Sequence, residues 1–354
     1  MKRLHQLLFA LTIIFLGSCG GPAPSTPDDQ KRQEKSANNQ LDSLINTADT
    51  SKVSSQLYPP NASELDQSAL LDLAEQHIDD KNFAYARNFI QRAAERDSNS
   101  ARFLDLKGRF LLLGNRSQQA FKTWKRCTEL HADEVGCRIH LSELQLTLGL
   151  HRDALQTANS IIKIDRQVPE GFFLKGMAIR ALNGDTTGAI PYFQQAVDLR
   201  NDYVEALDML GVIYAQRKDS LALSYYRNVL RYEPDRADIY YKIGVFHMEK
   251  RDWNKAMAAY ETAVKIDPKN ADSYYNLGFI LTQLQVYDKA RDNFARAISV
   301  SQRNFKAHYG RGFSFEMLGD LTNAATDYRT ALSIRPNHQA SAEALARVKK
   351  KMAD

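Results

Sequence analysis

The sequence predicts an all-α protein, a solenoid of about eight helix-turn-helix repeats closed by one C-terminal helix. A fixed period of about 20 to 50 residues indicates a repeat architecture, and apolar residues spaced three and four apart indicate helices. With 44% hydrophobic and 25% charged residues, the chain has the composition of a folded protein. The period itself is carried by an alanine that recurs every 33 to 35 residues, at Ala86, Ala120, Ala154, Ala189, Ala222, Ala256, Ala290 and Ala324.

Residues 1–18 have the pattern of a signal peptide. Two basic residues precede an apolar run from Leu7 to Leu16, which is much shorter than the ~20 residues of a membrane-spanning helix. The run ends in Leu16-Gly17-Ser18-Cys19, which resembles the lipobox of bacterial lipoproteins. That resemblance implies a diacylglycerol on Cys19 and, because Gly20 is not aspartate, a place on the periplasmic face of the outer membrane. An ordinary cleaved secretory signal is the alternative.

Residues 19–66 are rich in Gly, Pro, Ser, Asn, Asp and Gln. Such a composition predicts a flexible tether without a core of its own. A tether of this length has a root-mean-square reach of roughly 35 to 40 Å. We therefore expect it to hold a folded domain away from the lipid surface.

Residues 67–338 contain the eight repeats. A small residue lies about twelve positions before each periodic alanine, and a large residue lies four positions after most of them. A small residue facing an alanine lets two helices approach closely while the large residue fills the space beside them. The pattern resembles the tetratricopeptide repeat (TPR), most closely over residues 271–304 with the motif Tyr274-Tyr275-Asn276-Leu277-Gly278. The resemblance implies a right-handed superhelix whose concave surface, lined by the first helix of each pair, binds protein or peptide partners.

The same resemblance assigns a protein-binding groove to aromatic residues on the first helices. Tyrosine is common at these positions in TPR sequences, so packing is an equal alternative for the tyrosines. Phenylalanine is more informative, because an exposed phenylalanine is unfavourable without a partner. The predicted groove residues are Phe173, Tyr241, Tyr275, Phe279, Tyr309 and Phe313.

Charge at the inward positions favours a partner with basic flanks. Four bases stand against eleven acids there, although four of the acids begin helices, where a carboxylate is favoured in any case. The acids are Glu75, Asp79, Asp105, Glu143, Glu170, Glu205, Asp208, Asp238, Glu249, Asp272 and Glu316.

The third repeat departs most from the pattern, with polar residues at positions that are apolar elsewhere. We expect its junction to be the weakest in the stack. Cys127 and Cys137 flank the turn before it, where side chains of antiparallel helices can meet. A disulfide and a pair of buried thiols are both open. A zinc site that includes His131 or His140 lacks a recognisable ligand spacing.

Several function classes are disfavoured. A net charge of +5 is far below the concentrated positive charge of a nucleic-acid-binding protein. The eight histidines are scattered, and the sequence has no HExxH motif, no phosphate-binding loop and no nucleophile elbow. We therefore expect no enzyme, no cofactor and no metal site.

Residues 339–354 predict a capping helix with Leu345, Val348 and Met352 on one stripe. Its basic residues, Arg347 and Lys349 to Lys351, either solvate the cap or contact anionic lipid or glycan.

Taken together, the sequence predicts a membrane-anchored scaffold that binds protein partners during envelope assembly, secretion or proteolysis. A permanent structural subunit of an envelope complex and a glycan- or peptidoglycan-associated regulator are the alternatives.

Overall fold

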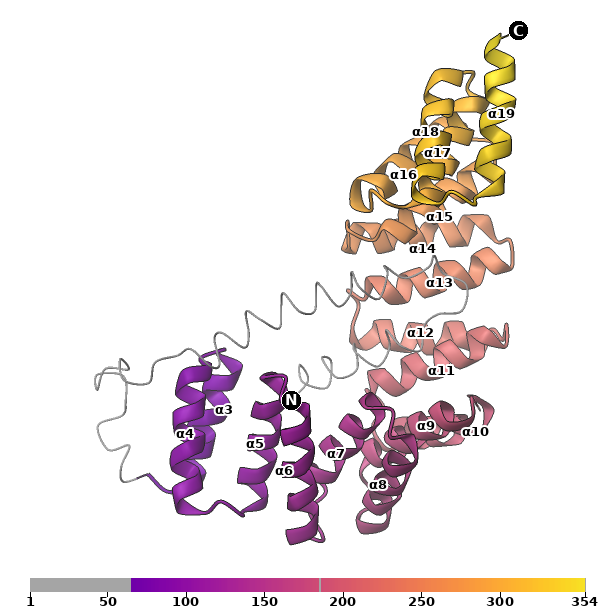
Figure 1. Ribbon diagram of the computed structural model, residues 1–354. Helices are drawn as coiled ribbons and strands as arrows, with labels where there is room; N and C mark the ends of the chain where they lie inside the picture. The colour runs from indigo at the N-terminus through magenta and orange to yellow at the C-terminus, as the bar shows by residue number, and fades with distance from the viewer. Residues whose placement is uncertain (1–64, 185, 354) are drawn as a thin grey trace. The chain divides into compact units, whose positions relative to one another are not determined.

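The structure, a computed structural model, describes residues 65–184 and 186–353. The predicted signal peptide, Cys19 and the tether up to residue 64 lie outside the described residues. Within the described part of the chain every regular element is a helix, seventeen in all (Figure 1). The prediction of an all-α repeat protein is therefore confirmed.

The chain divides into two compact units, and the first ends at Asn201. Its described helices form four antiparallel pairs, in which the first helix of each pair packs on the second (Figure 1). The pairs are α3 (Gln67–Asp79) with α4 (Phe83–Arg96), α5 (Ala101–Leu113) with α6 (Ser117–Leu130), α7 (Gly136–Thr147) with α8 (His151–Ile164), and α9 (Pro169–Asn183) with α10 (Thr186–Leu199).

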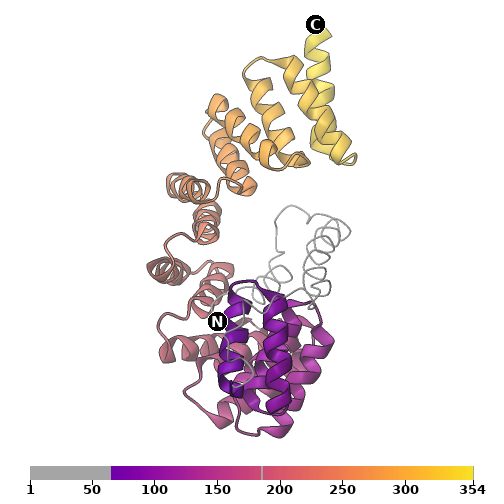
Figure 2. The same cartoon turned by 90° about the vertical axis from the view of Figure 1, so that its left-hand side faces the viewer.

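The second unit begins at Asp202 and contains four further pairs and a final single helix. The pairs follow one another along the unit, as two views of the ribbon show (Figures 1 and 2). They are α11 (Val204–Gln216) with α12 (Leu221–Tyr232), α13 (Ala237–Glu249) with α14 (Trp253–Ile266), α15 (Ala271–Gln283) with α16 (Tyr287–Val300), and α17 (Phe305–Met317) with α18 (Leu321–Ile334), followed by α19 (Gln339–Ala353).

The turn inside each pair has the same backbone conformation in all eight repeats. One residue just after the first helix has a positive φ, between 55° and 85°, which ends the helix in the left-handed region. Five of these residues are not glycine, so the turn recurs even where the sequence carries no glycine signal. The residues are Lys81, Asn115, Gly149, Gly184, Lys218, Arg251, Gln285 and Gly319.

Close approach of the two helices in a pair explains the periodic small residues. A Cβ atom added to Gly211 would lie 2.4 Å from the ring of Tyr226, and one added to Gly278 would lie 2.8 Å from the ring of Phe294. The ring of the second helix thus lies directly against the backbone of the first. This geometry is the one expected from the alternation of small and large residues.

The last helix, α19, covers the end of the eighth repeat. Val348 and Ala344 are buried and pack with Tyr328 of α18, and Leu345 packs at their edge. Met352, in contrast, is 50% exposed. The predicted stripe therefore ends at Val348, and the prediction that Met352 packs in the cap is wrong because α19 extends beyond the surface that it covers.

Candidate protein-binding face

Three first helices of the second unit, α13, α15 and α17, place a tyrosine at the same position of successive repeats. Each ring packs against an aromatic ring of its own repeat and is only half-buried, so part of every tyrosine faces outward. The sequence left packing and recognition as alternatives, and this geometry serves both. The ring pairs are Tyr241 with Tyr260 at 5.7 Å, Tyr275 with Phe294 at 5.8 Å, and Tyr309 with Tyr328 at 5.7 Å.

One helical turn beyond the last two tyrosines, two phenylalanines lie on the same side of their helices. Phe279 is 37% exposed. Phe313 is half-buried and meets the ring of Tyr287 edge-on at 6.2 Å. We call the surface formed by Tyr241, Tyr275, Phe279, Tyr309 and Phe313 the aromatic face.

Phe173 does not resemble these residues, and the prediction that it lines a binding groove is wrong. Its side chain is only 5% exposed. The ring packs against Phe193 at 5.7 Å, which is the same arrangement as in the tyrosine pairs. Because phenylalanine lacks the hydroxyl group that extends a tyrosine outward, nothing of Phe173 is offered to a partner.

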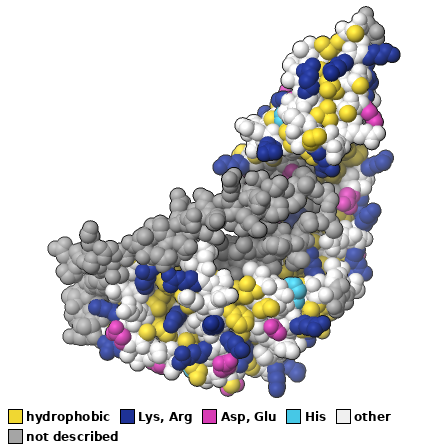
Figure 3. Space-filling model, in the orientation of Figure 1, with side chains coloured by type: hydrophobic (Ala, Val, Ile, Leu, Met, Phe, Trp, Pro, Cys, Tyr) yellow, Lys and Arg dark blue, Asp and Glu magenta, His cyan; other side chains and the backbone are white. Residues whose placement is uncertain are grey.

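Exposed apolar side chains also occupy the turns of the last two repeats. Leu284 and Val286 lie between α15 and α16, and Met317 and Leu318 lie at the end of α17. We call these four residues the turn edge. In the space-filling view, hydrophobic side chains lie among Lys and Arg side chains over the C-terminal helices (Figure 3). Exposed apolar residues also occupy the equivalent turn of the third repeat, at Leu148 and Leu150, so the turn edge continues a feature that the first unit shares.

Most of the acids predicted to face inward are paired with bases, so the count of acids at these positions overstates the negative charge that a partner would meet. The base usually comes from the next repeat, about one period later in the sequence. Of these bases, Arg109 is at an expected inward position, whereas His140, Arg200 and Lys242 are not among the inward bases expected from the sequence, although the repeat period is a signal that points to His140 and Lys242. The pairs are Glu75 with Arg109 at 2.7 Å, Asp105 with His140 at 2.7 Å, Glu170 with Arg200 at 2.7 Å, and Asp208 with Lys242 at 2.7 Å.

Glu316 is the most completely bonded of these acids. Its carboxylate accepts hydrogen bonds from Arg347 at 2.8 Å, from Lys351 at 2.9 Å and from the hydroxyl of Tyr328 at 2.9 Å. The hydrogen bonds from Arg347, followed by those from Lys351 and Tyr328, lower the pKa of Glu316 to about 2. Two of the four basic residues that the sequence offered to lipid or glycan thus have an internal partner.

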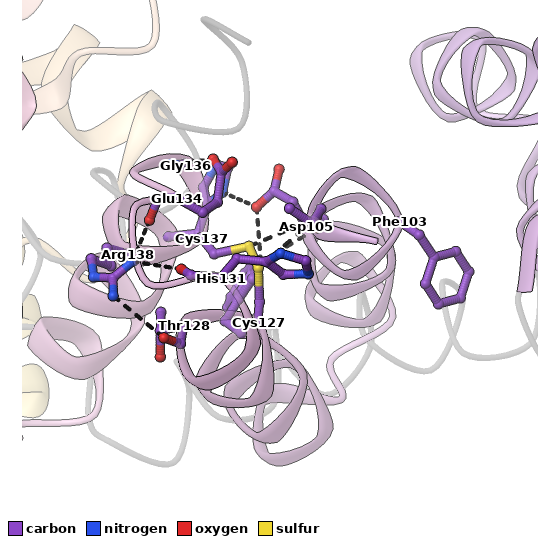
Figure 4. The surroundings of a disulfide bond; sticks show 12 residues. Phe103, Asp105, Cys127, Thr128, His131, Glu134, Gly136, Cys137 and Arg138 are labelled. Atoms are coloured by element: carbon purple, nitrogen blue, oxygen red, sulfur yellow. Dashed lines mark hydrogen bonds and ion pairs between the residues drawn. A yellow bond between two sulfur atoms is a disulfide. The ribbon is translucent and has the colours of Figure 1, made fainter. Parts of the chain in front are cut away.

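Cys127 and Cys137 form a disulfide, one of the two alternatives that the sequence left open (Figure 4). It joins α6 to α7 across the turn between the second and third repeats, with 6.2 Å between the Cα atoms, and both cysteines are fully buried. Beside it, the guanidinium of Arg138 donates hydrogen bonds to the carbonyl oxygens of Glu134 at 2.5 Å and His131 at 3.2 Å. Burial lowers the pKa of Arg138.

Two polar residues at normally apolar positions of the third repeat, Ser142 and Gln145, are hydrogen-bonded. Ser142 donates a hydrogen bond to the carbonyl oxygen of Ala154 at 3.2 Å, and Thr157 donates one to the side-chain oxygen of Gln145 at 2.8 Å. The boundary between the compact units follows Asn201, after the fourth repeat. The structure therefore does not divide at the third repeat, where the sequence analysis expected the weakest junction.

The two histidines considered for zinc have separate partners. His131 donates to the carbonyl oxygen of Asn99 at 2.6 Å, and His140 contacts Asp105. Across residues 65–184 and 186–353, no three His, Cys, Asp or Glu side chains gather as a metal site. In the same part of the chain, no helix combines the length and the apolar character needed to cross a bilayer.

Comparison with family profiles matches two segments of the second unit. Residues 247–285 match a profile described as TPR repeat, and residues 281–346 match one described as tetratricopeptide repeat. Together the two matches span residues 247–346. The predicted family resemblance is thus confirmed for this stretch, which contains Tyr275, Phe279, Tyr309 and Phe313. No curated protein matches the chain.

Solved structures extend the TPR fold beyond this stretch. The C-terminal part of a TPR repeat-containing protein from Cytophaga hutchinsonii matches 70% of this chain and 99% of its own, with 14% identity and a TM-score of 0.58. The Cut9-Hcn1 hetero-tetramer of the APC/C matches 92% of this chain and 60% of its own, with 18% identity and a TM-score of 0.51. At these identities the similarity establishes the solenoid fold alone.

Proposed function

We propose that the protein is a membrane-anchored TPR scaffold that binds protein partners through the aromatic face and acts in envelope assembly, secretion or proteolysis. TPR proteins generally act as scaffolds for protein interactions and are typically not enzymes. The observation that carries the proposal is the exposure of Phe279, at 37%, together with Phe313 on the same side of the next first helix. Exposed aromatic rings in a row favour burial by a partner.

The anchor in this proposal is the acylated Cys19, exposed by cleavage after residue 18. Several acyl chains contribute about 0.8 kcal/mol for each buried methylene group, which makes the attachment stable without a spanning helix. Expression of the Cys19→Ala variant tests it. We expect wild-type protein in the outer-membrane fraction with an N-terminal mass that includes diacylglycerol, and unacylated variant in the soluble fraction. Wild-type protein without the lipid mass would overturn the anchor.

Crosslinking in intact cells followed by mass spectrometry tests the binding face. The double variant Phe279→Ala/Phe313→Ala removes one exposed and one half-buried ring. Leu221→Ala is the control, because Leu221 is also an exposed apolar residue of the second unit. We expect partners to be lost from the double variant and kept by the control. Partners that persist undiminished in the double variant would show that the face is not the binding site.

A permanent subunit of an envelope complex is the second candidate, and the turn edge favours it. The apolar side chains of the turn edge lie outside the aromatic face. They are therefore available to contact a second protein, other than the one bound at the aromatic face. The two candidates differ in how the protein behaves alone. A scaffold that binds its partners reversibly is expected to be stable when it is purified alone. A permanent subunit is expected to be degraded in cells that lack the other subunits of its complex.

A further inference from the structure

In all four repeats of the second unit, a charged residue occupies the second position of the first helix. These residues are Glu205, Asp238, Asp272 and Lys306. Glu205 lies on α11, which carries no residue of the aromatic face. Asp238 is paired with Arg236, which donates hydrogen bonds to it at 2.7 and 2.8 Å. Asp272 differs, because within the described residues no basic nitrogen lies within 4.0 Å of its carboxylate. It is the half-buried acid of the aromatic face without an ion-pair partner.

The charge of Asp272 acts on two tyrosines of the aromatic face. Burial raises the pKa of Tyr241 and of Tyr275, and the charge of Asp272 raises both further. Tyr275 lies one turn along α15 from Asp272. Tyr241, from α13 of the preceding repeat, packs in a core cluster that includes Leu277 of α15. Tyrosines of two successive repeats therefore lie at or against the helix that carries the carboxylate.

Burial also raises the pKa of Asp272 itself. The cation that opposes this effect is Lys306 of the next repeat, whose charge lowers the pKa of Asp272 from beyond ion-pair distance. The negative charge of a half-buried carboxylate that is only partly compensated by neighbouring cations is stabilised by an added cation. Aromatic rings beside it strengthen the attraction for a cation.

We propose that the aromatic face binds a basic side chain of its partner, a Lys or Arg held by the Asp272 carboxylate between Tyr241 and Tyr275, next to an apolar side chain that packs on Phe279 and Phe313. The inference rests on the proposed function and specifies the partner. A Lys or Arg adds a charge-assisted hydrogen bond to the cation–π attraction. The apolar side chain of the partner covers the rings of Phe279 and Phe313. One contact therefore requires a positive charge and the other requires an apolar group.

The spacing of the two contacts predicts a motif. Asp272 and Phe279 are seven residues apart on α15, which corresponds to about 10 Å along a helix axis. An extended chain advances about 3.3 Å per residue. The basic and the apolar residue of an extended partner segment are therefore expected about three positions apart.

Selection from a displayed library of random peptides on the purified full-length chain tests the inference. We expect selected peptides to combine Lys or Arg with a large apolar residue about three positions away. A synthetic copy of one selected peptide is then compared with the same peptide carrying Gln in place of the basic residue. We expect the Gln peptide to bind the wild-type chain about tenfold more weakly, which requires no protein variant.

Two matched variants assign the effect to one carboxylate. Asp272→Asn should bind the basic and the Gln peptide equally, whereas Asp238→Asn, the same change one repeat earlier, should keep the tenfold preference. Peptides that require Phe279 and Phe313 but show no basic preference, or an acidic one, would overturn the inference and leave the proposed function intact. Peptides that bind Phe279→Ala/Phe313→Ala as tightly as wild type would overturn both. Self-association of the wild-type chain that the double variant lacks would assign the face to a second copy and also overturn the inference.

Discussion

The two units use equivalent positions of the same repeat for different purposes. At the position held by Phe279 and Phe313 in the second unit, the first two repeats of the first unit carry Glu75 and Arg109, which pair with each other at 2.7 Å. Arg109 is buried, and its charge is already compensated by Glu75, so the pair has little to gain from a partner. Exposed rings gain by being covered. The comparison teaches that the repeat fixes the geometry, whereas the residue at one position decides whether that place carries an internal ion pair or an aromatic ring that is open to solvent.

The units also differ in what stabilises them. The first contains the Cys127–Cys137 disulfide, and its largest buried side chain, Trp124, donates a hydrogen bond to Asp105 at 3.1 Å. The second has no disulfide among its described residues and ends in the contacts of Glu316 with α19. Because the sequence contains two tryptophans, Trp124 in the first unit and Trp253 in the second, each unit can be followed by its own fluorescence after the other tryptophan is replaced by phenylalanine.

The largest expected effect is that of Phe294→Ala in the second unit. Phe294 is buried and lies against the backbone of two first helices, at Gly278 and Gly310. Loss of a buried phenylalanine ring costs roughly 3 to 5 kcal/mol of unfolding free energy. In urea titrations we expect the Trp253 transition to shift strongly and the Trp124 transition to shift much less. Equal shifts would contradict the independence of the two units.

The next largest effect concerns the disulfide. The two cysteines are 10 residues apart, and closing a loop of that length in the unfolded chain stabilises the fold by ~2–3 kcal/mol. Reduction should lower the urea midpoint reported by Trp124, while the midpoint reported by Trp253 is unchanged. The Cys127→Ala/Cys137→Ala variant is the control, because its midpoint should not respond to reductant. A reductant effect that persists in this variant would contradict the prediction.

A smaller effect is expected when Glu316 is titrated. Its pKa is about 2 in the folded protein and 4.5 in a model peptide, so the folded state binds this proton more weakly than the unfolded state. The resulting stability is present above the unfolded pKa and is lost as the pH falls toward the folded pKa. The thermal unfolding temperature of the second unit should therefore fall as the pH is lowered from about 4.5 to about 2. The Glu316→Gln variant should lose part of this pH dependence. An identical pH profile in the variant would contradict the assignment.

The smallest effect on stability is expected for Phe279→Ser/Phe313→Ser. The exposed part of each ring contributes little to the core, so the unfolding free energy should change by less than about 1 kcal/mol. Partner binding should nevertheless be lost, because that is where the rings would be buried. Unfolding titrations and a pull-down of crosslinked partners check the two parts separately. A large loss of stability would show that the rings serve the fold rather than recognition.

The repeat architecture could be predicted from the sequence because its physical cause lies within one period. Gly278 and Phe294 belong to the same repeat, and their close approach is visible as spacing alone. Phe279 and Phe313 could be placed on one side of their helices for the same reason. The left-handed backbone conformation at Lys81 and at the other non-glycine turn positions could not be predicted from the sequence, because no glycine marks these positions.

What the sequence analysis missed depends on contacts between repeats. The inward acids were counted as free charges, but Asp208 is neutralised by Lys242 from the next repeat. Phe173 occupies a position equivalent to that of the tyrosines, but its ring is buried against Phe193. An alignment of the repeats with one another would have revealed the ion pairs. Burial of Phe173 depends on packing that no pattern of spacing records.

Site-specific photocrosslinking in intact cells tests the central claim most directly. A photoreactive phenylalanine analogue is placed at the position of Phe279 in the second unit or, as the matched control, at the position of Glu75 in the first. The account predicts a crosslinked partner from the Phe279 position and none from the Glu75 position. Crosslinks from the Glu75 position alone, or equally from both, would contradict the assignment of partner binding to the aromatic face.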